Sequence, residues 1–224
     1  MKSEFSIKEL GELKYCLGIE VHRDRTKKTI RMNQSAYIKR LAEKFGVDKC
    51  KDVHTPTSES EHLTKCRQDE DVVSTRPYRE LVGALMYVAT CTRPDIMHAV
   101  GEVARYCESH EKQHWIAAKR ILKYLKTTKD YSFVFDGNKE DKLIGFADAS
   151  WASDLHSRRS TTGYVFFLNS RVVSWKSRRQ PTVATSSTEA EYMHGFVLRN
   201  SRGGLAASSA FRSRICTRRS NDDP

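Results

Sequence analysis

The sequence predicts an α+β protein, because strand patterns occupy its beginning and its last part while helical patterns fill the middle. Three observations support this fold class. Apolar residues alternate with a period of two near the N-terminus and again after Asp130. Apolar residues with helical spacing run from Tyr78 to Lys126, and turn and capping residues stand at the boundaries. A chain of 224 residues is long enough for two modest domains.

The N-terminal region predicts a β-hairpin followed by a helix. Residues 13–21 have strand character, and a second short strand covers residues 29–32 after a polar turn. Ser35 is a suitable N-cap for a helix that runs to Phe45, and Gly46 is a natural stop.

A polar linker from residue 50 to residue 77 separates this region from a set of helices. The predicted helices cover residues 78–92, 94–107 and 112–126, with Pro94 in the first turn of the second. The outward face of the last helix carries Lys119, Arg120, Lys123 and Lys126. Such a face is either a solvated surface or a track for phosphate groups, and both interpretations stay open.

Strand patterns return after Asp130. They cover residues 131–135, 143–148, 163–168 and 172–176. A helix is then expected to begin near Ser186, because two capping-box spacings overlap there, Ser186 to Glu189 and Thr188 to Glu191. Beyond Leu198 no periodicity persists, which predicts a disordered basic tail.

Composition and charge narrow the classes of function. The formal net charge of +11 favours a polyanionic partner such as nucleic acid, because each cation placed near a phosphate releases counterions. No apolar run reaches the roughly 18 residues of a membrane span, and the N-terminus lacks a signal peptide. The six cysteines form no CxxC pair, which indicates free thiols. We therefore expect an intracellular protein, cytoplasmic or nuclear, with no membrane partner.

Several ordered motifs resemble the Pol polyprotein of Ty1/copia-type retrotransposons. Three of them are similar to the connector that follows the reverse transcriptase: YRELVGALMY at 78–87, TRPDI at 92–96 and HWIAAKRILKYL at 114–125. Four resemble the ribonuclease H of the family: GFADASW at 145–151, RSTTGY at 159–164, SWKS at 174–177 and SSTEAEY at 186–192. Residues 10–15 and 17–21 resemble the stretch after the polymerase active site.

The resemblance implies a division of the chain into five regions. They are the end of the reverse transcriptase palm and thumb at 1–49, a linker at 50–77, a helical connector at 78–130, a partial ribonuclease H-like domain at 131–198 and a disordered basic tail at 199–224. The ribonuclease H part is expected to form an incomplete mixed sheet.

The resemblance also implies a metal site. Ribonuclease H chemistry uses two Mg²⁺ ions about 4 Å apart, held by three or four carboxylates. Asp148 on the first strand and Glu191 on the following helix match the first two of these catalytic, metal-binding acids. The other two positions fall beyond about residue 195, where the resemblance ends. Asp154, Asp222 and Asp223 are poor substitutes, because a surface loop or an unstructured tail does not hold a ligand in place.

We therefore expect a truncated Pol fragment that is catalytically inactive and retains binding to nucleic acid, an RNA/DNA hybrid in particular. The family's polymerase aspartates would lie upstream of Met1. The alternative is a Mg²⁺-dependent ribonuclease H whose missing acids come from elsewhere. No small-molecule substrate is expected, and the sequence does not indicate an oligomeric state.

Two further sequence features could have either a functional or a purely structural role. Residues 110–114 fit the H-E-x-x-H pattern of a zinc peptidase, but they stand at a helix start rather than within a helix, so we interpret the match as chance. Trp115, Trp151 and Trp175 could stack on bases, and core packing is the expected role of each.

Overall fold

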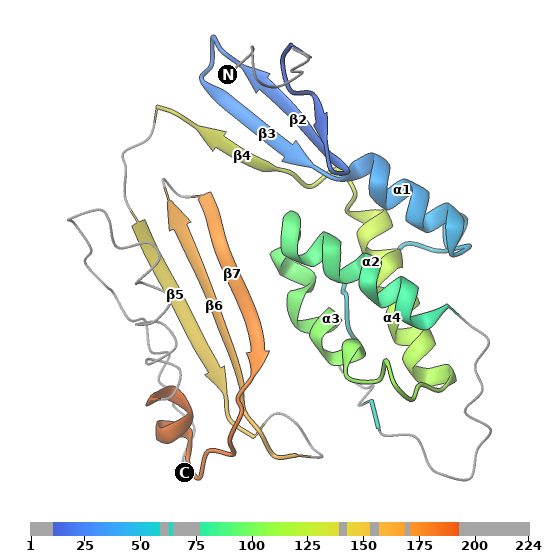
Figure 1. The fold of residues 1–224 in the computed structure, drawn as a ribbon, viewed down its shortest axis with the longest axis vertical. Coiled ribbons are helices and arrows are strands. Elements are labelled where there is room, and N and C mark those ends of the chain that lie inside the picture. Colours follow the sequence, from blue (N-terminus) through green and yellow to red (C-terminus); the bar gives the residue numbers. More distant parts are fainter. Residues whose placement is uncertain are drawn as a thin grey trace, which may run out of the picture.

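The computed structural model describes residues 11–58, 63–64, 77–138, 143–152, 157–168 and 171–192. Within these ranges the helices form one block and the strands form two sheets, with strand orders β1-β2-β3-β4 and β5-β6-β7 (Figure 1). The predicted α+β class is confirmed. All described strand pairs are antiparallel, so the parallel pair that a mixed sheet requires does not occur among them.

The first predicted strand is divided by a tight turn. In place of one strand over residues 13–21, the structure has β1 (Tyr15–Cys16) and β2 (Ile19–Asp24), which pair with each other. Leu17 and Gly18 between them have φ angles of 49° and 77°. Positive φ at both central residues is the geometry of the two-residue hairpin turn that matches strand twist. The prediction of a continuous strand was wrong because apolar alternation does not reveal this turn.

The predicted hairpin is confirmed by the pairing of β2 with β3 (Thr29–Asn33). The other edge of β3 pairs with β4 (Phe133–Asp136), which comes after all of the helices. Residues 131–135, which include most of β4, are predicted from the sequence to belong to the same domain as the strands that follow. A period-two pattern identifies a strand but not its partner, so only the fold shows that the N-terminal sheet ends near residue 138.

The helices follow the predicted boundaries to within a few residues. They are α1 (Ser35–Lys44), α2 (Tyr78–Cys91), the short 3₁₀ helix η1 (Pro94–Ile96), α3 (Met97–Ala104) and α4 (Lys112–Thr127). The second predicted helix is therefore a 3₁₀ turn that continues into α3, with Pro94 at its start as expected.

The start of α1 differs from the prediction in its cap. The N-cap residue is Gln34, and its side chain makes no capping hydrogen bond. The backbone N–H of Ser35 donates instead to Asn33 Oδ1 at 3.2 Å, and that of Ala36 donates to Glu20 Oε1 at 2.8 Å. A carboxylate from β2 thus satisfies the helix start and ties it to the sheet. Gly46, with φ at 61°, ends the helix as predicted.

The four helices enclose the main hydrophobic core. The side chains at its centre are almost fully buried: Leu81, Leu85, Val88, Ile96, Val100, Ile121, Leu122 and Leu125. Burial of each contributes roughly 1.5–3 kcal/mol relative to exposure. Trp115 packs against this core and meets the ring of Phe45 edge-on, which confirms its expected structural role.

The second sheet consists of β5 (Leu143–Ser150), β6 (Thr161–Leu168) and β7 (Arg171–Arg179). Strand β7 packs against the helices through α3 (Figure 1). Trp175 on β7 donates its indole N–H to the backbone oxygen of Ala89 on α2 at 2.9 Å, and its ring packs against Phe133. This tryptophan joins the two parts of the molecule.

Several predictions lie outside the described residues. They concern Asp154, Asp222 and Asp223, the basic tail at 199–224, and most of the second half of the linker. The described residues of the linker, 50–58, 63–64 and 77, contain no helix or strand. None of the helices in the described ranges is both long and apolar enough to cross a membrane.

Candidate functional site

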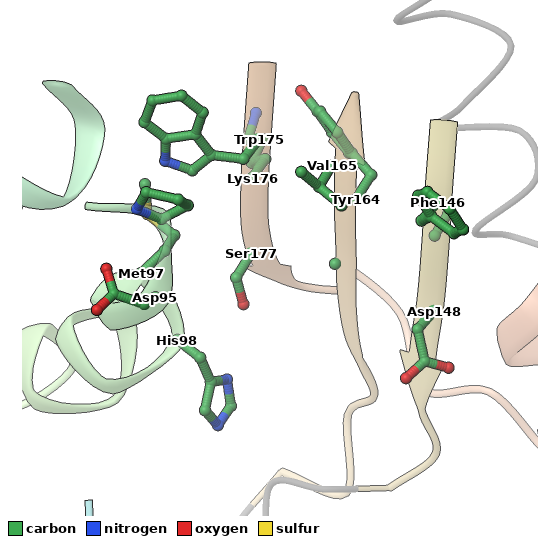
Figure 2. Close-up of a pocket in the computed structure, with 13 residues that line it drawn as sticks. Asp95, Met97, His98, Phe146, Asp148, Tyr164, Val165, Trp175, Lys176 and Ser177 are labelled. Atoms are coloured by element: carbon green, nitrogen blue, oxygen red, sulfur yellow. The ribbon is translucent and has the colours of Figure 1, made fainter. Parts of the chain in front are cut away.

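Asp148 lies on β5, on the face of the second sheet that carries Trp175 on β7. The strand register pairs Asp148 with Gly163 and Gly163 with Ser177, so these positions share one face. The Asp148 side chain is exposed and borders a cavity of about 380 Å³ between this face and the helices. Figure 2 shows His98 and Asp95 on the helical side of the same cavity.

Asp148 has few partners of its own. Its Oδ1 accepts the backbone N–H of Ala149 at 2.9 Å, and no ion pair involves its carboxylate in the described ranges. Gly163, its partner on the neighbouring strand, has no side chain, and a Cβ built there would meet the backbone oxygen of Lys176 at 3.9 Å. A carboxylate in this setting is available to a cation from solvent.

Asp95, the other carboxylate of the cavity, is already engaged. Arg93 approaches its Oδ2 at 2.6 Å, and the hydroxyl of Tyr124 donates to the same oxygen at 2.8 Å. Burial alone would raise the pKa of Asp95, but the hydrogen bonds and charge of Arg93 outweigh it and hold the pKa below its usual value. Asp95 therefore serves the packing of the helices rather than a metal site.

Glu191 lies on a helical segment at residues 187–192 that begins where the capping pattern predicted. Ser186 Oγ accepts the N–H of Glu189 at 3.1 Å, which is one of the two bonds of the predicted capping box, while the Glu189 side chain reaches Thr185 instead of Ser186. The Glu189 carboxylate accepts the N–H of Thr185 at 2.7 Å and its hydroxyl at 2.5 Å, and these bonds lower the pKa of Glu189. Thr188 is within the helical segment, so the second spacing does not act as a cap.

The helical segment is fixed to the sheet through Gln180. Its Nε2 donates to the backbone oxygen of Ala190 and to Thr162 Oγ1, both at 2.9 Å, and all three residues are buried. Glu191, the next residue, is exposed and does not border the cavity of Asp148. The two predicted acids are thus both exposed, and Glu191 lies on a segment that is fixed to β6 through Gln180.

The described residues do not by themselves meet the needs of a two-metal site. No group of three His, Cys, Asp or Glu side chains within these ranges is arranged to hold a metal ion. Two Mg²⁺ ions require several convergent carboxylates to fix their positions. Asp148 and Glu191 alone do not supply them.

The H-E-x-x-H motif has a structural role. His114 is buried, with its Nδ1 accepting the N–H of Glu111 at 2.9 Å and its Nε2 2.9 Å from the backbone oxygen of Thr64. Both ring nitrogens are therefore engaged, and burial lowers the pKa of His114. His110 precedes α4 and stacks on Tyr78. This geometry argues against a zinc site.

Two of the four basic residues on the outward face of α4 contact the linker of the same chain. Arg120 donates to Thr55 Oγ1 at 2.9 Å, and Lys126 pairs with Asp52 at 2.9 Å and donates to the oxygen of Cys50 at 2.6 Å. These contacts fasten the linker residues to the helix. They favour a structural role for this face over a phosphate track.

Sequence reasoning missed a cluster of arginines. A second cavity, of about 450 Å³, is bordered by Arg105 after α3, by Arg159 before β6, and by Arg178 and Arg179 on β7. A signal for it exists in the sequence, because the triplet Ser-Arg-Arg occurs at 157–159 and again at 177–179.

Comparison with known proteins finds relatives that match most of the chain. It is 39% identical over 198 residues to the retrovirus-related Pol polyprotein from transposon TNT 1-94 of Nicotiana tabacum, a match of 86% of this chain and 15% of that protein. It is 34% identical over 218 residues to the uncharacterized mitochondrial protein AtMg00810 of Arabidopsis thaliana, covering 96% of this chain and 86% of the relative. It is 50% identical over 117 residues to the secreted RxLR effector protein 161 of Plasmopara viticola, covering 52% and 82%.

No family model and no solved structure matches the chain. The chain spans 15% of the length of the tobacco polyprotein and 13% of that of a second Pol relative, from transposon RE2 of Arabidopsis thaliana, to which it is 35% identical over 192 residues. Identity at this level, maintained across most of the chain in several transposon relatives, confirms the resemblance of the motifs. The chain therefore belongs to the family of copia/Ty1-type retrotransposon Pol polyproteins.

Proposed function

We propose that this chain corresponds to the part of Pol that joins the end of the reverse transcriptase to the first strands of ribonuclease H, and that it binds nucleic acid without cleaving it. In this proposal the N-terminal sheet and α1 belong to the palm and thumb, and α2 to α4 form the connector. Strands β5 to β7 with the helical segment at 187–192 begin the ribonuclease H sheet. The order of strands followed by a capped helix supports this assignment.

One observation carries the proposal of inactivity. Of the two carboxylates that border the cavity beside β5, Asp95 is held by Arg93 and Tyr124, and only Asp148 is available to a metal ion. Glu191 is not among the residues that border this cavity. Any Mg²⁺ held here would be bound weakly, because a single carboxylate rarely retains this strongly hydrated ion.

Nucleic-acid binding is supported by the charge of the chain. The net charge of +11 includes arginines gathered at one cavity beside the sheet. Cations near phosphates release counterions, so the affinity of such binding falls steeply with salt.

The test is to mix the purified chain with a labelled RNA/DNA hybrid and Mg²⁺, and to follow both binding and cleavage. We expect binding that weakens about tenfold or more between 50 and 200 mM salt, with no cleavage. Asp148→Asn should leave the affinity close to that of the unmodified chain. Failure to bind at low salt would contradict the proposal.

A second candidate function is favoured by the exposure of Asp148. Because this carboxylate has no cationic partner in the described ranges, it could complete a ribonuclease H site with acids supplied from elsewhere. Cleavage of the RNA strand that disappears in Asp148→Asn and in Glu191→Gln would establish this activity and refute the first proposal.

The state of the cysteines supports a proposal about the cellular compartment of the chain. Cys16, Cys50, Cys91 and Cys107, the cysteines among the described residues, are all free thiols. Free thiols suit a reducing compartment, which supports an intracellular location in the cytoplasm or nucleus as part of the proposal.

A further inference from the structure

The two Ser-Arg-Arg triplets meet at one end of the β6-β7 pair. The register places Thr161 opposite Arg179, and the N–H of Gln180 donates to the backbone oxygen of Ser160 at 2.8 Å. Arg179 Nη1 lies 3.4 Å from Ser157 Oγ, which links the two triplets directly. Arginines twenty residues apart in the sequence are thus brought together by strand pairing.

A third element adds another arginine. Arg105, at the C-cap of α3, borders the same cavity of about 450 Å³ as Arg159, Arg178 and Arg179. The carboxylate that also borders it, Glu102, pairs with Arg105 at 2.6 Å. Four arginine residues therefore border the cavity, and Glu102 is the acidic residue among its described lining residues.

We propose that this cavity binds phosphate groups of a nucleic-acid backbone. Guanidinium groups suit this ligand, because each presents a planar set of N–H donors that can form two parallel bonds to phosphate oxygens. The hydroxyls of Thr161 and Ser177, which also border the cavity, are further donors of the kind found at phosphate contacts. The inference rests on the proposed function and names the surface that performs it.

The position of the cavity relates it to Asp148. His98 and Ser177 border both this cavity and the one beside Asp148, so the two are neighbours on the same side of the sheet. A strand whose phosphates occupied the arginines would continue toward the face that carries Asp148. The arginine cavity therefore sets where a nucleic acid lies on the second sheet.

The test compares two double variants with the same loss of charge. Arg159→Gln with Arg179→Gln removes two cations from the cavity, whereas Arg23→Gln with Arg31→Gln removes two exposed cations from the other sheet. For the cavity variant we expect hybrid affinity to fall about tenfold or more at low salt, and the slope of log affinity against log salt to drop by about 2. The control variant should change both quantities by much less. Equal effects in the two variants would overturn the inference while leaving the proposed function standing.

Inorganic pyrophosphate provides a probe that does not depend on hybrid binding. It should raise the Tm of the unmodified chain and of the control variant, and leave the Tm of the cavity variant unchanged. If hybrid binding is absent but this pattern holds, the cavity stands and the proposed function fails. If pyrophosphate shifts no Tm, or shifts all three alike, the cavity proposal is refuted.

Discussion

Arg93 carries a full charge with only 3% of its side chain exposed. Its guanidinium pairs with Asp95, donates to the backbone oxygen of Thr128 at 3.0 Å and to Thr128 Oγ1 at 2.6 Å, and lies over the rings of Tyr124 and Tyr131. A buried charge is tolerated only when it is paired and hydrogen-bonded in this way. Through these contacts, Arg93 and Asp95 of the TRPDI motif hold the end of α2 and η1 against the C-terminal end of α4.

Asp95→Asn should destabilise the chain by removing the negative partner of Arg93. We expect a loss of about 2 kcal/mol in the free energy of unfolding, below the 3–5 kcal/mol of a fully buried pair because Asp95 keeps contact with solvent. Urea denaturation at pH 7 measures it. Asp48→Asn, which removes an exposed carboxylate, should change stability by less than about 0.5 kcal/mol. Equal losses in the two variants would show that the buried pair is not responsible.

His114 predicts a pH dependence of stability. Burial lowers its pKa in the folded chain below the ordinary 6.5, so the unfolded chain binds more protons as the pH falls through that value. The stabilisation by neutral His114 is complete above 6.5 and is lost as the pH falls toward the folded pKa. The free energy of unfolding should thus decrease between pH 7.5 and pH 5, and His114→Gln should flatten this slope. An unchanged slope in the variant would assign the effect to other groups.

At the scale of elements, the turn between β1 and β2 places Leu17 in the left-handed backbone region, which leucine disfavours. Leu17 adopts a φ of 49° and is 80% exposed, so it gains little from packing. Asparagine tolerates this conformation far better, and Asn-Gly is the preferred pair for such a turn.

Leu17→Asn should therefore raise the free energy of unfolding, by roughly 0.5–1 kcal/mol. Thermal unfolding followed by circular dichroism measures the change. Gly18→Ala is the informative contrast, because Gly18 has a φ of 77° and an added Cβ would be strained, so this variant should be less stable. A lower Tm for Leu17→Asn would contradict the role of the turn.

At the scale of the whole molecule, stability depends on how the second sheet joins the helices. The helical core is extensive, whereas the second sheet has fewer buried side chains, with Phe166, Ala184 and Ala190 among them. Trp175 bridges the two parts through Ala89 and Phe133. The sheet therefore gains stability from this contact in addition to its own packing.

Trp175→Phe keeps an aromatic ring but removes the indole N–H that donates to Ala89. We expect a loss of about 1 kcal/mol in the free energy of unfolding, measured by urea denaturation with circular dichroism. Trp151→Phe is the matched control, since its N–H donates to Ala184 at 3.2 Å within the second part and its side chain is half exposed. A larger loss in the control would show that the bridge does not stabilise the molecule.

Most elements could be predicted because local patterns specify them. The spacing of apolar residues located the four α-helices α1 to α4 of the described ranges, and Gly46 and Ser186 marked an end and a start correctly. Asp148 and Glu191 came from motif resemblance, and their role as metal ligands stays a prediction. The arginine cavity was missed because its members belong to separate elements, and charge repeats alone do not show that two segments converge.

The sequence by itself determined the α+β class, the order of helices and strands, and the family, since each depends on residues that are neighbours in the chain. Only the tertiary structure decided that β4 pairs with β3 in the N-terminal sheet. It also decided that Asp95 forms an ion pair with Arg93, and that residues of both Ser-Arg-Arg triplets border one cavity. The physical reason is that periodicity and capping act over a few residues, whereas strand partners and charge clusters form between segments that only folding brings together.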